Sequence, residues 1–162
     1  MLLGIERVMD AGECEPGRFY LKLNYNDDPS IFQCVKVGDD DDDLMALWLT
    51  PGTDRPLGLE TIPDHEPLVA LPPVHIRVDA PSMYASNRTT AIRPGMFLVS
   101  NDEAFVVAPS GFRGYSTINI STGLPVPKRW APDWLAFSRW LLVIEDNGEE
   151  IPIASFGETS GS

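Results

Sequence analysis

Two histidines and a carboxylate could form a metal site or an acid–base group. His75, Arg77 and Asp79 alternate with apolar residues, so we expect them on one face of a strand. If His65 approaches the same face, two imidazoles and a carboxylate could hold a transition metal or transfer a proton. The alternative is a solvent-facing strand with an Arg–Asp ion pair, which contributes little to stability.

A run of consecutive carboxylates follows Gly38. It consists of Asp39, Asp40, Asp41, Asp42 and Asp43. The run offers hard oxygen ligands but lacks the alternating spacing and the bidentate Glu of a calcium-binding loop. It could instead imitate a phosphate backbone and compete for the basic groove of a partner. The alternative is a solvated hairpin loop that keeps a strand edge from aggregating.

Cations and tryptophans make a second candidate surface. Residues 67–139 carry seven basic and four acidic side chains within a chain of net charge −12. Three of the four tryptophans lie between Trp130 and Trp140. Aromatic side chains beside cations are common at interface hot spots, although they serve equally well in a core. Besides the aspartates, the residues expected to contact a partner are Arg88, Arg93, Arg113, Lys128, Arg129, Trp130 and Trp134.

One further set of residues resembles a known family. The segment 76–83 ends in Pro-Ser-Met, the segment 92–99 contains Arg-Pro-Gly-Met, and Lys128 is followed by Arg. Together they resemble the Ser-Met and Gly-Asp region and the Lys-Arg pair of LexA-type self-cleaving serine peptidases. The resemblance implies that Ser82 is a nucleophile and that Lys128, desolvated and neutral, is its general base. The prolines before Ser82 and Lys128, and the Met in place of Asp, depart from the family pattern.

Length, charge and termini exclude several classes of protein. With 162 residues, 43% of them apolar, we expect one domain over 1–156 and a flexible tail over 157–162. The negative charge opposes direct binding to nucleic acid or to an anionic membrane. Residues 1–10 resemble neither a signal peptide nor a membrane span, so a cytoplasmic protein, or a virion protein if the source is viral, is expected. No motif indicates a cofactor. Cys14 and Cys34 are interpreted as free thiols.

Alternating apolar residues predict a mainly β fold. Segments 18–25, 31–37 and 44–49 fit a three-stranded meander. Apolar runs within 96–108 and 140–156 predict two hairpins. The second hairpin turns at an Asn-Gly pair, whose residues tolerate positive φ. We expect a sandwich or partly open barrel of short antiparallel strands.

Two segments are harder to place within such a fold. Residues 51–81 contain seven prolines among many apolar residues, which predicts an extended arm lying on a surface rather than in a sheet interior. Near 132–138, Pro and Asp precede aromatic residues that are spaced for one helical face, so one short helix is expected there.

The function expected from these features is a non-enzymatic, acidic protein-interaction module. It would be either a subunit of a larger assembly, such as a virion component, or an acidic inhibitor of a basic partner. A protein partner or a second copy of the chain would bind it. The alternative function is the serine peptidase with the dyad of Ser82 and Lys128.

Overall fold

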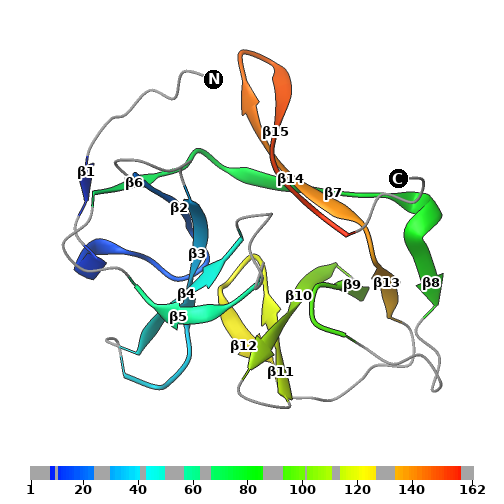
Figure 1. Ribbon diagram of the computed structural model, residues 1–162, viewed down its shortest axis with the longest axis horizontal. Helices are drawn as coiled ribbons and strands as arrows, with labels where there is room; N and C mark the ends of the chain where they lie inside the picture. Colours follow the sequence, from blue (N-terminus) through cyan, green and yellow to red (C-terminus); the bar gives the residue numbers. More distant parts are fainter. Residues whose placement is uncertain are drawn as a thin grey trace.

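A computed structural model shows a mainly β fold (Figure 1), which confirms the predicted class. It describes residues 8–9, 11–23, 30–40, 43–49, 57–62, 67–85, 93–100, 102–110, 114–126 and 134–157. The elements within these ranges are β1 (Val8–Met9), η1 (Ala11–Glu13), β2 (Phe19–Lys22), β3 (Ser30–Lys36), β4 (Leu44–Trp48), β5 (Leu59–Thr61), β6 (Leu68–Ala70), β7 (Val74–Val78), η2 (Ala80–Ser82), β8 (Met83–Ala85), β9 (Phe97–Ser100), β10 (Glu103–Ser110), β11 (Gly114–Asn119), β12 (Leu124–Val126), β13 (Leu135–Phe137), β14 (Trp140–Asp146) and β15 (Glu149–Phe156).

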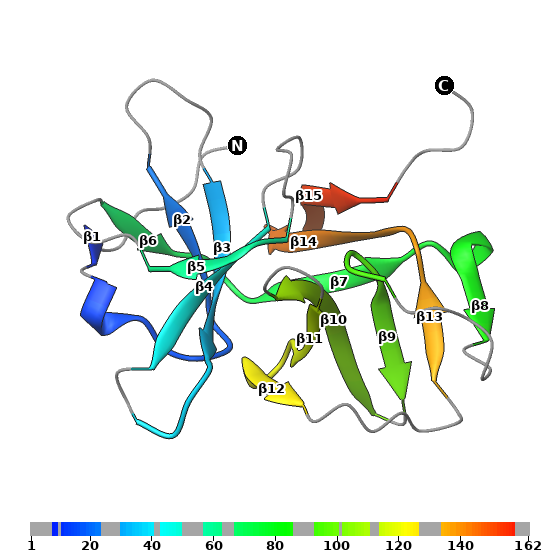
Figure 2. The ribbon, with the colours of Figure 1, turned by 60° about the horizontal axis from the view of Figure 1, so that its bottom comes forward.

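The strands form three antiparallel sheets. The first has the order β1-β6-β2-β3-β4-β5, the second β12-β11-β10-β9-β13-β8, and the third β15-β14-β7. Figure 2 shows the first and second sheets at opposite ends of the molecule. Each sheet ends in edge strands, so none of the described strands closes a barrel, and the arrangement is consistent with a sandwich. Both helical elements of the described chain are three-residue 3-10 turns, and neither has the length needed to cross a membrane.

The predicted meander is confirmed in the first sheet, where β2, β3 and β4 pair in sequence order. The prediction of an extended arm over 51–81 is wrong for its described residues. β5 pairs with β4, and β6 lies between β1 and β2 inside the sheet. This is possible because Pro67 and Pro72 flank β6, so that the strand itself contains no proline. The chain then continues as β7 into the third sheet (Figure 1).

Both predicted hairpins are confirmed. β9 pairs with β10, and β14 pairs with β15. In the second hairpin Asn147 has φ 50° and Gly148 has φ 81°, the left-handed conformations that a tight hairpin turn needs. This hairpin builds the third sheet, because β14 also pairs with β7 on its other side.

The short helix predicted near 132–138 is wrong for the residues described there. Leu135–Phe137 form β13, which lies between β9 and β8 in the second sheet. Ala136 and Phe137 point to opposite faces of the sheet and are both buried, in two different apolar clusters, whereas Leu135 is exposed. Of the predicted flexible tail, only Gly157 belongs to the described residues.

One cluster of buried side chains draws on all three sheets. It includes Phe19 from the first sheet, Phe97 from the second, and Trp140 and Phe156 from the third. The rings of Trp140 and Phe156 stack with their centroids 4.1 Å apart. The sheets are therefore held against one another by a shared apolar core.

A smaller buried cluster contains both cysteines. Cys14 and Cys34 are free thiols that pack with Tyr20 within the first sheet. Burial raises the pKa of Cys14 from 9.0 to about 11 and that of Cys34 from 9.0 to about 12. Burial also raises the pKa of Tyr20 from 10.0 to about 12, although its hydroxyl accepts a hydrogen bond from the Glu15 amide. All three groups stay protonated in the folded chain at neutral pH.

We expect the free energy of unfolding to fall as the pH rises from about 9 toward 12. The unfolded chain ionises these groups near their ordinary pKa values of 9.0 and 10.0, whereas the folded chain keeps their protons until about pH 11 to 12. Each such group lowers stability by up to about 1.4 kcal/mol per pH unit within that window. Urea titrations under reducing conditions at several pH values measure the slope. Cys34→Ala should make it shallower, and a constant stability up to pH 11 would contradict the burial.

Candidate functional site

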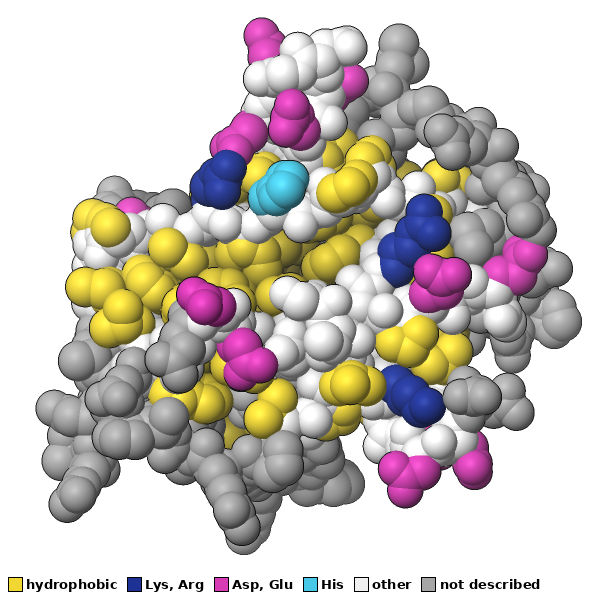
Figure 3. Space-filling view, turned by 180° about the vertical axis from the view of Figure 1, so that it is seen from behind, with side chains coloured by type: hydrophobic (Ala, Val, Ile, Leu, Met, Phe, Trp, Pro, Cys, Tyr) yellow, Lys and Arg dark blue, Asp and Glu magenta, His cyan; other side chains and the backbone are white. Residues whose placement is uncertain are grey.

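A hollow on the surface lies beside β7, where the third sheet faces the second. It has a volume of about 740 Å³, within the range of about 300–1,000 Å³ that is typical of ligand-binding clefts. Figure 3 shows its apolar floor open to solvent. The residues that make the lining mostly apolar include Val74, Ile76 and Val78 from β7 and Phe97, Val99 and Ala104 from β9 and β10. We call this hollow the β7 groove.

The β7 groove is bounded by an edge of the third sheet. In the described part of the chain, β7 pairs only with β14. The Asp79 amide continues this pairing, because it donates to the Arg139 carbonyl at 3.0 Å. Paired and unpaired groups alternate along an antiparallel strand, so the backbone N–H and C=O groups of Val74, Ile76 and Val78 point away from β14. These residues line the groove, which therefore contains an open strand edge.

Gln33 fixes one end of the groove. Its side chain is fully buried, and its Nε2 donates to the carbonyl of Gly17 at 3.1 Å and to the carbonyl of Ile120 at 2.6 Å. Gly17 and Ile120 both line the groove, although Gly17 precedes β2 of the first sheet and Ile120 follows β11 of the second. One buried amide thus holds two segments of the groove wall together.

The charged part of the groove lining is basic. Arg18 and His75 line the groove, and none of its described lining residues is Asp or Glu. The Arg18 guanidinium lies 3.9 Å from a Glu15 carboxylate oxygen, and both side chains are at least half exposed. Such a pair is weak, so Arg18 can also meet an incoming anion. The groove is a local exception in a chain of net charge −12.

The predicted metal or acid–base group is not assembled among the described residues. His75 and Arg77 are exposed on β7 as the alternation predicted, and His65 lies outside the described residues. The expected pair between Arg77 and Asp79 is wrong. Arg77 pairs with Glu150 across the third sheet, which lowers the pKa of that carboxyl, and Asp79 pairs with Arg139 at 2.7 Å. No metal-binding group of three or more His, Cys, Asp or Glu occurs in the described part of the chain.

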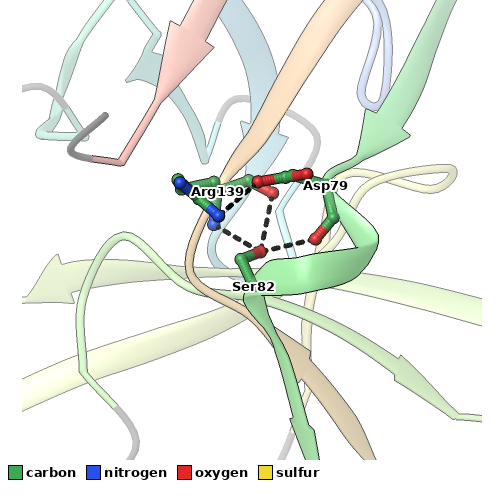
Figure 4. A network of polar contacts seen from close by, with 3 residues as sticks. All are labelled: Asp79, Ser82 and Arg139. Atoms are coloured by element: carbon green, nitrogen blue, oxygen red, sulfur yellow. Dashed lines mark hydrogen bonds and ion pairs between the residues drawn. The ribbon is translucent and has the colours of Figure 1, made fainter. Parts of the chain in front are cut away.

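The Ser82 hydroxyl contacts main-chain groups at the corner between β7 and β8. It lies 2.7 Å from the Asp79 carbonyl and 3.2 Å from the Arg139 carbonyl, its two acceptors, and it accepts from the Arg139 amide at 3.0 Å. Figure 4 shows this network together with the ion pair of Asp79 and Arg139. Lys128, the other member of the dyad implied by the peptidase resemblance, lies outside the described residues. In this arrangement Ser82 holds together the turn after β7 and the start of β14.

We expect Ser82→Ala to lower the free energy of unfolding by about 1–3 kcal/mol, because the Arg139 amide and the Asp79 carbonyl lose a buried partner. Chemical denaturation measures the change. Ser138→Ala is the matched control, since its exposed side chain should matter by less than about 0.5 kcal/mol. Equal stability of the two variants would contradict the structural role. Loss of peptide cleavage in a stably folded Ser82→Ala would instead support the peptidase alternative.

The structure corrects one member of the predicted partner-binding set. Trp134 is 6% exposed and stacks on Phe105, with ring centroids 5.0 Å apart, so it belongs to the core of the second sheet. Arg93 is exposed, as an interface residue must be. The other basic and aromatic residues of that set lie outside the described residues, namely Arg88, Arg113, Lys128, Arg129 and Trp130.

Part of the acidic run forms the turn between β3 and β4. Asp39 and Asp43 are exposed, and the Asp40 amide donates to the Asp43 carboxylate at 3.3 Å. Asp41 and Asp42 lie outside the described residues. The described aspartates therefore occupy the turn between β3 and β4 and are not part of the lining of the β7 groove.

Neither the β7 groove nor Gln33 is among the features expected from the sequence. The alternation over 74–78 indicated an exposed face and an apolar face, but the hollow depends on which strands lie opposite β7. A signal for Gln33 was available, because a glutamine between apolar residues in a strand is unusual unless its amide is hydrogen-bonded.

Comparison with known proteins does not identify this site. No protein family, curated protein or solved structure matches the chain. The β7 groove must therefore be interpreted from its own geometry.

Proposed function

We propose that this protein is a non-enzymatic interaction module that holds a protein partner in the β7 groove. The observation that carries the proposal is the coincidence of an apolar hollow with an open strand edge. Apolar hollows in contact with water mark binding sites, and open strand edges recruit other chains. A bound protein segment would cover both features at once.

The contacts of Ser82 favour binding over hydrolysis. A serine nucleophile needs a neighbouring base to take its proton, whereas this hydroxyl lies among the main-chain groups of Asp79 and Arg139. The β7 groove lies on the other side of β7 from β14 and has no described carboxylate in its lining. Its apolar and basic lining suits recognition of a partner.

Affinity capture with a blocked groove tests this proposal. Ala104 lines the groove from β10, so Ala104→Arg places a long charged side chain inside it. Ser155→Arg on the exposed side of β15 is the matched control, because it adds the same charge outside the groove. Proteins from the source organism should be retained by the wild type and by Ser155→Arg but lost with Ala104→Arg. If both variants fold and Ala104→Arg retains the same proteins as the wild type, the groove is rejected as the binding site.

A further inference from the structure

The open edge of β7 sets the form of the partner segment. The backbone groups of Val74, Ile76 and Val78 that point away from β14 repeat at every second residue. Only an extended chain presents N–H and C=O groups with the same repeat. β7 has five residues, so a matching segment spans about 17 Å, at about 3.3 Å per residue.

The floor of the groove sets the side chains of that segment. Phe97, Val99 and Ala104 lie beneath the open edge on one face of the second sheet. An added strand turns every second side chain toward this floor and the others toward water. Apolar residues should therefore alternate with polar ones in the segment that binds.

The charges favour another protein over a second copy of this chain. Arg18 and His75 are the charged or titratable residues of the lining, so an acidic side chain in the segment has a complementary site. Two copies with net charge −12 each would repel one another, and each would bring the same basic groove to the contact.

From these three observations, and resting on the function proposed above, we infer that the β7 groove takes an extended segment of another protein by strand addition. The segment alternates apolar and polar side chains and carries at least one acidic residue. It pairs with β7 and becomes the fourth strand of the sheet β15-β14-β7. Backbone pairing supplies the affinity, and the apolar floor and Arg18 supply the specificity.

A displayed library of random peptides provides the probe. Peptides enriched on the wild-type protein should alternate apolar and polar residues, include an acidic residue, and lose binding to Ala104→Arg. The most enriched peptide is then synthesised with an N-methyl group at one amide at a time. In strand addition only every second amide of the peptide faces β7, so methylation should weaken binding about tenfold or more at alternate positions and little between them.

A pair of variants at Val78 tests the same contact from the protein side. Val78 is 37% exposed and lines the groove, and its amide points away from β14. Val78→Pro replaces the side chain with a ring and removes the amide hydrogen, whereas Val78→Ala shortens the side chain and keeps the amide hydrogen. Proline is tolerated where an edge strand faces outward, so both variants should fold. The peptide should bind Val78→Pro about tenfold more weakly than Val78→Ala.

The outcomes separate this inference from the proposed function. Peptides that need an open groove but show no alternation on N-methylation would overturn strand addition and leave the groove as a binding site. Peptides that bind Ala104→Arg as tightly as the wild type, or the absence of any enriched peptide, would overturn both strand addition and the proposed function of the groove. A dimer of the protein alone that dissociates when the peptide is added would identify a second copy as the occupant and overturn the inference of a foreign strand.

Discussion

Replacing Gly123 with alanine is expected to lower the free energy of unfolding by about 3 kcal/mol or more, and to prevent folding if the wild type is only marginally stable. Gly123 has φ +67°, and a Cβ there would lie 2.6 Å from the Cys34 carbonyl oxygen and closer still to the Gly17 amide nitrogen. Both obstacles are backbone atoms, one of Cys34 in β3 and one of Gly17 just before β2, so they cannot rotate away as a side chain would. Thermal and urea denaturation measure the loss.

Gly148→Ala separates the steric conflict from backbone strain. Gly148 also has a positive φ, +81°, but a Cβ there would meet nothing within 4 Å. Its substitution should therefore cost only the left-handed strain of about 1–2 kcal/mol. If Gly123→Ala costs no more than Gly148→Ala, the close backbone approach at Gly123 is contradicted.

The conflict at Gly123 also bears on the β7 groove. The turn before β12 meets the segment before β2 here, and the Lys36 amide donates to the Gly123 carbonyl at 2.9 Å. Gly17, on the other side of this contact, lines the groove and accepts from Gln33. If Gly123→Ala folds with the segments of Gly123 and Gly17 pushed apart, it should therefore bind a partner more weakly as well as being less stable.

Local sequence patterns were sufficient to predict the hairpin and the meander, because their paired strands are neighbours in the sequence. The hairpin of β14 and β15 follows from two apolar runs and the Asn-Gly turn, because positive φ at both turn residues is a property of those residues themselves. The meander of β2, β3 and β4 follows in the same way from alternation and short connections.

The two errors arose where tertiary context overrides local preference. The prolines around β6 predict an arm, yet those prolines lie beyond the ends of the strand and leave its amides able to pair. The helical spacing of Trp134 and Phe137 predicts a helix, yet Leu135–Phe137 form a strand between β9 and β8, in which the adjacent residues Ala136 and Phe137 are both buried. A short apolar run covered on both faces carries no period that distinguishes a strand from a helix.

The candidate site was beyond prediction for the same reason. The groove lies between β7 and strands β9 and β10, which are separated from β7 in the sequence and belong to another sheet. The open edge exists because one side of β7 has no partner strand among the described residues. No property of residues 74–78 specifies which side pairs. The prediction of Trp134 as an interface residue fails because an interface and a core select the same aromatic side chains.

Trp140→Ala is expected to cost about 3–5 kcal/mol, the range for removing a large buried aromatic side chain. Trp140 is 1% exposed and stacks on Phe156, and its Nε1 donates to the Gly95 carbonyl at 2.8 Å. Since β14 belongs to the third sheet and Gly95 precedes β9 of the second, the side chain joins two sheets. Chemical denaturation measures the loss.

A matched pair of Trp→Phe variants isolates the hydrogen bond within that loss. Trp140→Phe keeps a ring between the sheets but leaves the Gly95 carbonyl without its donor, so we expect a cost of about 1–3 kcal/mol. The buried Nε1 of Trp48 has no hydrogen-bond partner, and Trp48→Phe removes an unsatisfied donor. That gain offsets lost packing against Phe32, so its stability should change by less than about 1 kcal/mol. Equal losses in the two variants would show that ring volume, and not the bond to Gly95, holds the second and third sheets together.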